Sequence, residues 1–318
     1  MMQIRRFRDD DAEQIIQLFN NCFDREMSQN EWIWKYKKSP WGSVAYVAVD
    51  GRELVSYYGA IKCAISYQGT LLWTYQACDV MTHPDYRARI FGKKPLIVQT
   101  AELFYKENVM DFTFGFPSER NARLHNLVLG WSQHRKVALF KKNLNVKNIN
   151  NLSKYKPYIL RIGWDKVNAK DLDEVWKSCS KSLSLSILKE SKYLSWRYMD
   201  NPSHFYSLLT LKDIIKKTIV SSAIVKSSDS ELYVVDFFYN GREIFPYFWQ
   251  LLETYAIKIQ AKAINVWINY KEDIAKDLIG LGYKINEGAP FALRIMNGHA
   301  ITSDDFYTKY CYRIGDLL

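Results

Sequence analysis

The sequence predicts a mixed α/β protein built from two similar halves. Along its 318 residues, apolar stretches typical of β-strands alternate with amphipathic stretches typical of helices. The same elements return in the same order in the second half, and the length suits two domains of roughly 150 residues each. These observations predict two tandem domains, each a twisted mixed sheet flanked by helices.

In the first half, apolar periodicity and turn residues define each element. Asp9-Asp10-Asp11 provides an N-cap and an acidic first turn for the first helix, Asp50-Gly51 predicts a hairpin, and Pro117 ends a short buried strand. Residues 146–157 are poor in apolar side chains and predict a linker, so the expected domains are 1–145 and 158–318. We expect strands at 3–7, 44–49, 54–67, 71–81, 112–116 and 131–140, and helices at 9–19, 31–36, 91–108 and 121–129.

Three short anchors repeat in order and predict a tandem duplication. The pairs are Trp34-Lys35-Tyr36 with Trp196-Arg197-Tyr198, Asp79 with Asp236, and Leu129-Gly130-Trp131 with Leu281-Gly282-Tyr283. Between these anchors we expect helices at 168–182, 192–199, 242–259 and 271–281, and strands at 205–211, 217–226, 231–239 and 263–268.

Composition narrows the classes of function. The net charge is +10, but no basic tail or block concentrates it, so nucleic acid is not indicated and anionic small molecules fit as well. The five cysteines have no metal-ligand spacing and predict reduced thiols of a cytoplasmic protein with no metal. No apolar run is long enough for a membrane span, and no signal peptide is expected.

Residues 78–94 carry the main functional signal. An apolar strand ends at His83-Pro84, a basic turn follows, and a helical pattern begins near Phe91. Backbone N–H groups at a helix N-terminus attract anions, and four cations lie within this turn: Arg87, Arg89, Lys93 and Lys94. A phosphate-bearing ligand is one interpretation, and a solvated basic turn is the other.

Three motifs carry a resemblance to a known family. His83-Pro84-Asp85-Tyr86-Arg87 is similar to the strand end and pyrophosphate loop of the GNAT superfamily of acyl-CoA-dependent N-acyltransferases. Phe114-Gly115-Phe116-Pro117 resembles that family's fifth strand, and Asn121 through Leu129-Gly130-Trp131 resembles its fourth helix. The resemblance covers about residues 3–143. The second half matches only in the order of its elements and in Leu281-Gly282-Tyr283.

The resemblance implies acyl transfer from acetyl-CoA, or another acyl-CoA, to a primary amine of a small acceptor by direct attack in a ternary complex. The pantetheine arm would lie between strands 75–83 and 112–116. The implied cofactor-binding residues are Val80, Met81 and Thr82 for pantetheine, Arg87, Ala88, Arg89, Phe91, Gly92 and Lys93 for pyrophosphate, and Asn121 on the far side.

The sequence also departs from the family pattern. The loop lacks the middle glycine and is one residue short, which weakens the expected phosphate contact. Asn126 stands where many members have a tyrosine that protonates the leaving thiolate. In the second half Asn240-Gly241-Arg242-Glu243 replaces the basic turn, so that half is expected to bind no cofactor.

Four residues are candidates for the base that deprotonates the acceptor amine. Asp79 lies in an apolar strand, where burial would raise its pKa, but it could equally be a carboxylate bonded to a neighbour. His83 precedes a proline and could be structural, His125 could be merely exposed, and Glu119 could only favour the helix dipole.

Two other functions remain open. A non-catalytic binding protein is compatible with the shortened loop and Asn126, and an aminoacyl-tRNA-dependent transferase is compatible with the basic surface. The acceptor, the acyl length and the oligomeric state are not readable from the sequence.

Overall fold

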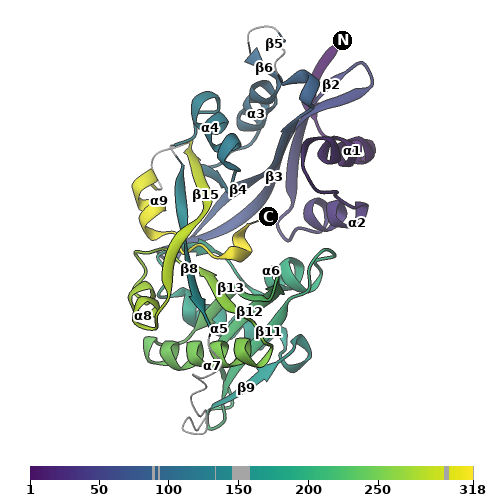
Figure 1. The fold of residues 1–318 in the computed structure, drawn as a ribbon. Helices are drawn as coiled ribbons and strands as arrows, with labels where there is room; N and C mark the ends of the chain where they lie inside the picture. The colour runs from purple at the N-terminus through teal and green to yellow at the C-terminus, as the bar shows by residue number, and fades with distance from the viewer. Residues whose placement is uncertain (88–89, 92–93, 133, 145–157, 297–300, 318) are drawn as a thin grey trace.

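One large mixed sheet runs through the whole molecule in the computed structural model, which describes residues 1–87, 90–91, 94–132, 134–144, 158–296 and 301–317. Thirteen of the strands formed by these residues join in the order β1-β2-β3-β4-β7-β15-β8-β14-β13-β12-β11-β9, with β10 paired to β3 (Figure 1). The mixed α/β class expected from the sequence is therefore confirmed, and the two expected sheets are joined into one.

The strands are β1 Met2–Arg6, β2 Ser43–Asp50, β3 Glu53–Tyr67, β4 Thr70–Thr82, β5 Ile90–Phe91, β6 Lys94–Pro95, β7 Phe112–Gly115, β8 Arg135–Asn143, β9 Tyr158–Ile162, β10 Leu185–Ile187, β11 Ser207–Asp213, β12 Ile219–Ser228, β13 Glu231–Tyr239, β14 Ala263–Trp267 and β15 Lys284–Ile295. The α-helices are α1 Ala12–Cys22, α2 Gln29–Trp32, α3 Leu96–Glu107, α4 Glu119–Val128, α5 Ala169–Ser180, α6 Ser191–Leu194, α7 Phe245–Lys258, α8 Ile274–Gly280 and α9 Ser303–Lys309. None of the helices among the described residues is long and apolar enough to cross a membrane.

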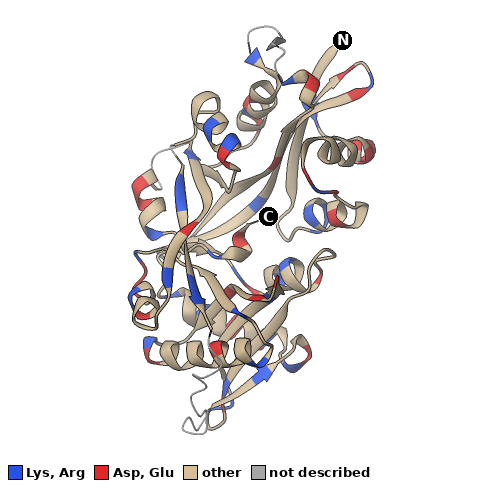
Figure 2. Ribbon diagram, in the orientation of Figure 1, with Lys and Arg blue, Asp and Glu red and all other residues tan. Residues whose placement is uncertain are grey.

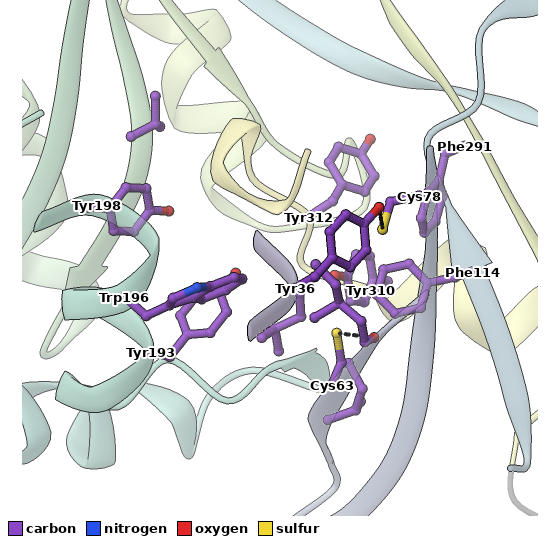
Figure 3. Packing of buried hydrophobic residues seen from close by; sticks show 14 of the residues in the cluster. Tyr36, Cys63, Cys78, Phe114, Tyr193, Trp196, Tyr198, Phe291, Tyr310 and Tyr312 are labelled. Carbon is purple, nitrogen blue, oxygen red and sulfur yellow. Dashed lines mark hydrogen bonds between the residues drawn. The ribbon is translucent and has the colours of Figure 1, made fainter. Parts of the chain in front are cut away.

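The helices cover both faces of the sheet. Strand residues alternate between the faces, so Tyr58 on β3 packs towards α3 while Tyr57 packs towards α1. In the second half α7 and α8 cover one face, and α5 packs on the other. The α1 and α5 faces share one continuous aromatic core, in which side chains from both halves meet, among them Tyr36, Trp196, Phe291 and Tyr310 (Figure 3).

Two strands cross from one half of the chain to the other. β15 lies between β7 and β8 and pairs antiparallel with both, and β8 pairs in turn with β14. Each half therefore completes its sheet with a strand from the other. The division into domains 1–145 and 158–318 stays a prediction, and the proposed linker, 146–157, lies entirely outside the described residues.

A local distortion occurs in both halves after a short helix. The chain passes from α2 into a π-helical turn at Ile33–Lys37, and from α6 into another at Ser195–Met199. These turns are the Trp34-Lys35-Tyr36 and Trp196-Arg197-Tyr198 anchors of the sequence repeat. Single π-turns inside helices are uncommon and store strain, so their recurrence at the repeated anchors supports the predicted duplication.

Some expected elements are displaced or were missed. The helix expected from Phe91 begins at Leu96, because Ile90–Phe91 and Lys94–Pro95 form the paired strands β5 and β6 and Pro95 is the N-cap. β10, β15 and α9 were not expected. β15 contains Gly288 and Pro290, which look like strand breakers, and its pairing with β8 shifts register between Glu287 and Pro290.

Candidate functional site

The site begins where β4 and β7 separate. These parallel strands pair only at Tyr75–Thr113 and Gln76–Phe114, and β4 then continues to Thr82 with no strand of the described residues on that edge. Asp79 has a left-handed φ of 52°, and the β3–β4 register shifts around it. The bulge bends β4 away from β7, and a cavity of about 880 Å³ opens beside it.

Several separate parts of the chain line this cavity. They are the end of α1 with the loop after it, β4, the turn at Tyr86 and Arg87, Pro95 with the start of α3, the β7–α4 loop with α4, Trp131 and Leu317. The volume lies in the range of roughly 300–1,000 Å³ that small-molecule sites occupy. The residues that line the cavity include Phe19, Phe23, Arg25, Gln76, Val80, Met81, Thr82, Arg87, Leu96, Gly115, Arg120, Asn121, His125, Trp131 and Leu317.

One end of the cavity is suited to an anion. The first turn of α3 and that of α4 both reach the lining, and Ser118 caps α4 by accepting a hydrogen bond from the backbone N–H of Asn121. The exposed cations Arg87 and Arg120 lie at the same cavity. The Arg87 guanidinium is held by a 2.9 Å hydrogen bond from its Nε to the Thr82 carbonyl. Two helix N-termini and two arginines together favour negative charge there.

Five of the expected cofactor residues line the cavity: Val80, Met81, Thr82, Arg87 and Asn121. Phe91 belongs to the β5–β6 hairpin, and its side chain is not described. Ala88, Arg89, Gly92 and Lys93 lie outside the described residues. Of the six residues predicted to bind pyrophosphate, two are therefore described, and Arg87 is the one that lines the cavity.

Asp79 lines the cavity, but its carboxylate is already occupied. Lys35 Nζ lies 2.8 and 2.9 Å from its two oxygens, and Tyr36 donates a 2.5 Å hydrogen bond to it. Lys35 is only 1% exposed. Because a buried lysine requires this carboxylate as its counter-ion, Asp79 is poorly placed to accept a further proton.

Of the four candidate bases, His125 is the one that the cavity favours. Its ring is only 3% exposed, lies 4.7 Å from the Trp131 ring and lines the cavity. Its Nδ1 is 2.6 Å from the Asn121 carbonyl oxygen, which can only accept, so Nδ1 carries the proton and Nε2 carries the lone pair. Burial lowers the pKa of His125, and the Asn121 bond only partly opposes this. The expectation that His125 could be merely exposed is wrong.

The other two base candidates lie away from the cavity lining. His83 caps the turn Pro84–Tyr86, where its Nδ1 accepts a hydrogen bond from the Asp85 N–H. Glu119 is exposed at the start of α4 and forms an ion pair with Lys136. Asn126 points away as well, and its amide donates a 3.1 Å hydrogen bond to the Trp131 carbonyl.

Sequence reasoning missed the part of the site that comes from distant segments. Phe19 and Phe23, one helical turn apart at the end of α1, were not identified as site residues, and Arg25 lies in the loop that follows. Leu317 reaches the cavity because Arg197, in the second half, donates hydrogen bonds to the Gly315 and Leu317 carbonyls. No local motif marks these residues, since their roles depend on the packing of the two halves. Among the described residues, no group of three or more His, Cys, Asp or Glu side chains is arranged to hold a metal.

Comparison with known proteins agrees with this geometry. Residues 3–122 match the acetyltransferase (GNAT) domain family. No curated protein matches the chain.

Among solved structures, a conserved protein of unknown function from Enterococcus faecalis V583, named a probable N-acyltransferase, is similar with a TM-score of 0.73 and 12% identity, over 93% of this chain and 72% of that one. A GCN5-related N-acetyltransferase from Anabaena variabilis is similar with a TM-score of 0.70 and 12% identity, over 93% and 73% of the two chains. The N-myristoyltransferase of Saccharomyces cerevisiae, with bound myristoyl-CoA, has a TM-score of 0.57 and 10% identity, over 93% and 79%. At these identities the similarity concerns the fold.

Proposed function

Because residues 3–122 carry a GNAT acetyltransferase domain, we propose that this protein transfers a short acyl group, most simply acetyl, from acyl-CoA to a primary amine. The observation that carries the proposal is the cavity at the separation of β4 and β7, with Arg87 and two helix N-termini at one end and neutral His125 in its wall. An acyl-CoA needs both a phosphate-binding end and an apolar channel for its arm.

The residues present fit such a substrate. The edge of β4 from Val80 to Thr82 faces the cavity without a partner strand among the described residues. The Thr82 carbonyl is already bonded to Arg87, so pantetheine would bond to the remaining backbone groups of this edge. Arg87, Arg120 and the first turns of α3 and α4 would hold the phosphates. When bound, acyl-CoA supplies the thioester carbonyl that an amine attacks.

The floor of the cavity favours a short acyl group. A Cβ on Gly115 would lie 3.0 Å from the Ala77 carbonyl oxygen and 3.5 Å from the Trp131 ring, so the two strands close again just below the bulge. Trp131 is 3% exposed, and its indole N–H donates a 2.9 Å hydrogen bond to Tyr105. An anchored ring and a closed strand pair leave little room for a long chain.

His125 is the residue that we assign as general base. Acceptor amines have a pKa of about 10 and arrive mainly as ammonium ions, so one proton must be removed before attack. His125 is held in the tautomer with its basic Nε2 unprotonated, and it lies in the wall of the cavity. Backbone N–H groups at Val80 and Met81 are suited to receive the oxyanion. Asp79 holds the bulge through its bonds to Lys35 and Tyr36.

We assign the second half a supporting role as a degenerate copy without a cofactor. Asp236 on β13 is bonded to Lys189 and Tyr198, much as Asp79 is bonded to Lys35 and Tyr36. β13 and β14 pair only from Glu231 to Val234, and beyond this point the turn Ile314–Asp316 packs on β13. Gly315 lies so close to Tyr198 and Val235 that no side chain would fit. The chain itself therefore occupies the corresponding position.

One observation favours a second candidate, a binding protein that has lost catalysis. Asn126 takes the expected place of the leaving-group acid and is engaged with Trp131. A thiol with a pKa of about 8.5 is, however, a good enough leaving group to depart unassisted.

All described cysteines are free thiols, which fits the reducing, cytoplasmic setting predicted from the sequence.

The experiment that separates these candidates follows release of free CoA from acetyl-CoA with a panel of amines. Release that depends on an added amine and falls strongly in His125→Gln supports the proposal. Binding of acetyl-CoA without amine-dependent release would favour the binding protein. Binding of tRNA that weakens with salt, with no acetyl-CoA binding, would favour the aminoacyl-tRNA-dependent transferase.

A further inference from the structure

A group of positive side chains from both halves adjoins the cavity on the side of Arg25 and Leu317. Arg197 lies in the π-turn Ser195–Met199, His204 follows it, Lys226 lies on β12, and Arg25 follows α1. We call Arg25, Arg197, His204 and Lys226 the basic cluster. Two carboxylates lie near the cluster: Asp229 acts on Lys226, and Glu31 is bonded to Arg25 at 2.8 Å and to Ser203 at 3.1 Å.

Arg197 is the unusual member of the cluster, because its guanidinium is buried and forms no ion pair with a carboxylate of the described residues. It is 5% exposed, and its guanidinium donates to the carbonyls of Gly315 at 2.9 Å and Leu317 at 2.5 Å. The ring of Trp34 lies 5.7 Å from it. Among the described residues no acidic side chain forms an ion pair with it. A buried cation is normally paired, so within the described residues the Arg197 charge is solvated by carbonyl groups but not neutralised by a carboxylate.

The neighbouring basic side chains are compensated only in part. Lys226 Nζ lies 3.2 Å from His204 Nδ1, and it forms no ion pair within the described part of the chain. Burial and the Arg197 charge lower the pKa of Lys226, while burial, then Lys226 and then Arg197 lower the pKa of His204. Glu31 opposes the lowering at His204 and Asp229 opposes it at Lys226, but both pKa values remain lowered, so the surroundings of the cluster stay positive. A bound anion would relieve this repulsion.

The cluster is connected to the cavity at two points. Arg25 itself lines the cavity, and Leu317, whose carbonyl Arg197 holds, lines it as well. Arg25 and Leu317 lie on the side of α1 and of the second half. Arg87 also reaches the end of α1, because its Nε and the Cys22 thiol both donate hydrogen bonds to the Thr82 carbonyl. An acceptor entering from this side would pass the cluster before its amine reached the bulge of β4.

We propose that the basic cluster binds an anionic group, a carboxylate or a phosphate, on the amine-bearing acceptor. The inference rests on the proposed acyltransferase function and names its acceptor class: amino acids, peptides with a free carboxylate near the amine, or amino sugar phosphates. Polyamines, which carry only positive charge, are excluded from this class because the cluster repels them.

The test compares matched acceptors that differ only in the anionic group. The pairs are amino acids with their carboxamides, and glucosamine with glucosamine 6-phosphate, with spermidine as the cationic control. The proposal expects kcat/KM for the anionic member to be higher by about ten-fold or more, as for a charge-assisted hydrogen bond. The two pairs distinguish carboxylate from phosphate. Equal rates for both members, or a preference for spermidine, would overturn it.

A single substitution tests whether the preference for anionic acceptors arises from the basic cluster. Lys226→Ala is expected to raise KM for the anionic acceptor about ten-fold without changing KM for acetyl-CoA. The matched control is Lys258→Ala, an exposed lysine at the end of α7, which should change neither value. An unchanged acceptor KM in Lys226→Ala would overturn the assignment.

Equilibrium binding makes the result independent of turnover. Calorimetry of glucosamine 6-phosphate and of the amino acids, with wild type and Lys226→Ala, reports the anion site even where no acyl transfer occurs. Binding that weakens about ten-fold in the variant supports the site, and no binding of either kind of anion overturns it. If the proposed acyltransferase function is wrong, the protein will fail to bind acetyl-CoA. That result is separate from failure of the anion site.

Discussion

Trp34 and Trp196 bond to each other reciprocally across the two halves of the protein. The indole N–H of Trp34 donates a 2.6 Å hydrogen bond to the Trp196 carbonyl, and the indole N–H of Trp196 donates a 2.8 Å bond to the Trp34 carbonyl. Their rings stack with centroids 5.4 Å apart. An isologous contact of this kind is what two copies of one unit make about a two-fold axis. It supports a duplicated chain whose halves pack face to face.

This contact is expected to contribute strongly to stability. Replacing either buried tryptophan by alanine should lower the free energy of unfolding by about 3–5 kcal/mol. Each variant also leaves a partner carbonyl without its donor, so the double variant should lose less than the sum of the two. Urea denaturation measures this. The control is Trp73→Ala, whose side chain is 41% exposed; equal losses at Trp34 and Trp73 would contradict the prediction.

The exchanged strands predict that the two halves depend on each other. Residues 1–145 expressed alone would lack β15, and residues 158–318 would lack β8, so each fragment would expose unpaired strand edges. We expect each fragment alone to be poorly folded by circular dichroism and amide exchange, and the two mixed fragments to recover structure. A fragment that folds stably by itself would show that the exchange is not needed.

The Lys35–Asp79 pair is expected to be structural rather than catalytic. Asp79→Asn keeps a residue that tolerates positive φ but leaves Lys35 without its counter-ion, so stability should fall by about 3–5 kcal/mol. Where the variant remains folded, kcat should stay near the wild-type value. Adding Lys35→Met should restore part of the lost stability, because the unpaired charge is removed. A large fall in kcat in folded Asp79→Asn would instead make Asp79 the base.

His125 predicts a specific pH dependence. Burial lowers its pKa below the ordinary value of 6.5, so the unfolded chain binds more protons than the folded one just below that pH. Stability should therefore be lost as pH falls from 6.5 through the lowered folded value, and this loss should be smaller in His125→Gln. The rate should fall over the same acid range as the base becomes protonated. An acid limb of the rate that persists unchanged in the variant would rule out His125.

The sequence predicted the part of the site that is continuous in the chain. Val80 to Thr82 and Arg87 follow closely along a strand and a turn, so their shared position at the cavity could be expected from periodicity and charge. His125 was found for the same reason, as part of a helix next to the Leu129-Gly130-Trp131 motif. Its burial was not foreseen, because it depends on Trp131 folding back beneath the ring.

Residues brought together by the two halves could not be predicted in this way. β15 was missed because Gly288 and Pro290 interrupt its apolar strand pattern. Without β15, the exchange of strands between the two halves cannot be predicted. Lys35 was read as one residue of a repeated anchor, and only the bulge at Asp79 reveals its role as a counter-ion. Arg197 and Leu317 meet through packing over a separation of 120 residues.

The central claim is that the cavity beside β4 binds acyl-CoA, and calorimetric titration with acetyl-CoA tests it most directly. We predict micromolar binding that weakens about ten-fold in Arg87→Ala, as expected for loss of a charge-assisted phosphate contact. Lys106→Ala, an exposed cation at the far end of α3, should bind like the wild type. No heat of binding from protein shown to be folded, at low and at moderate salt, would contradict the claim.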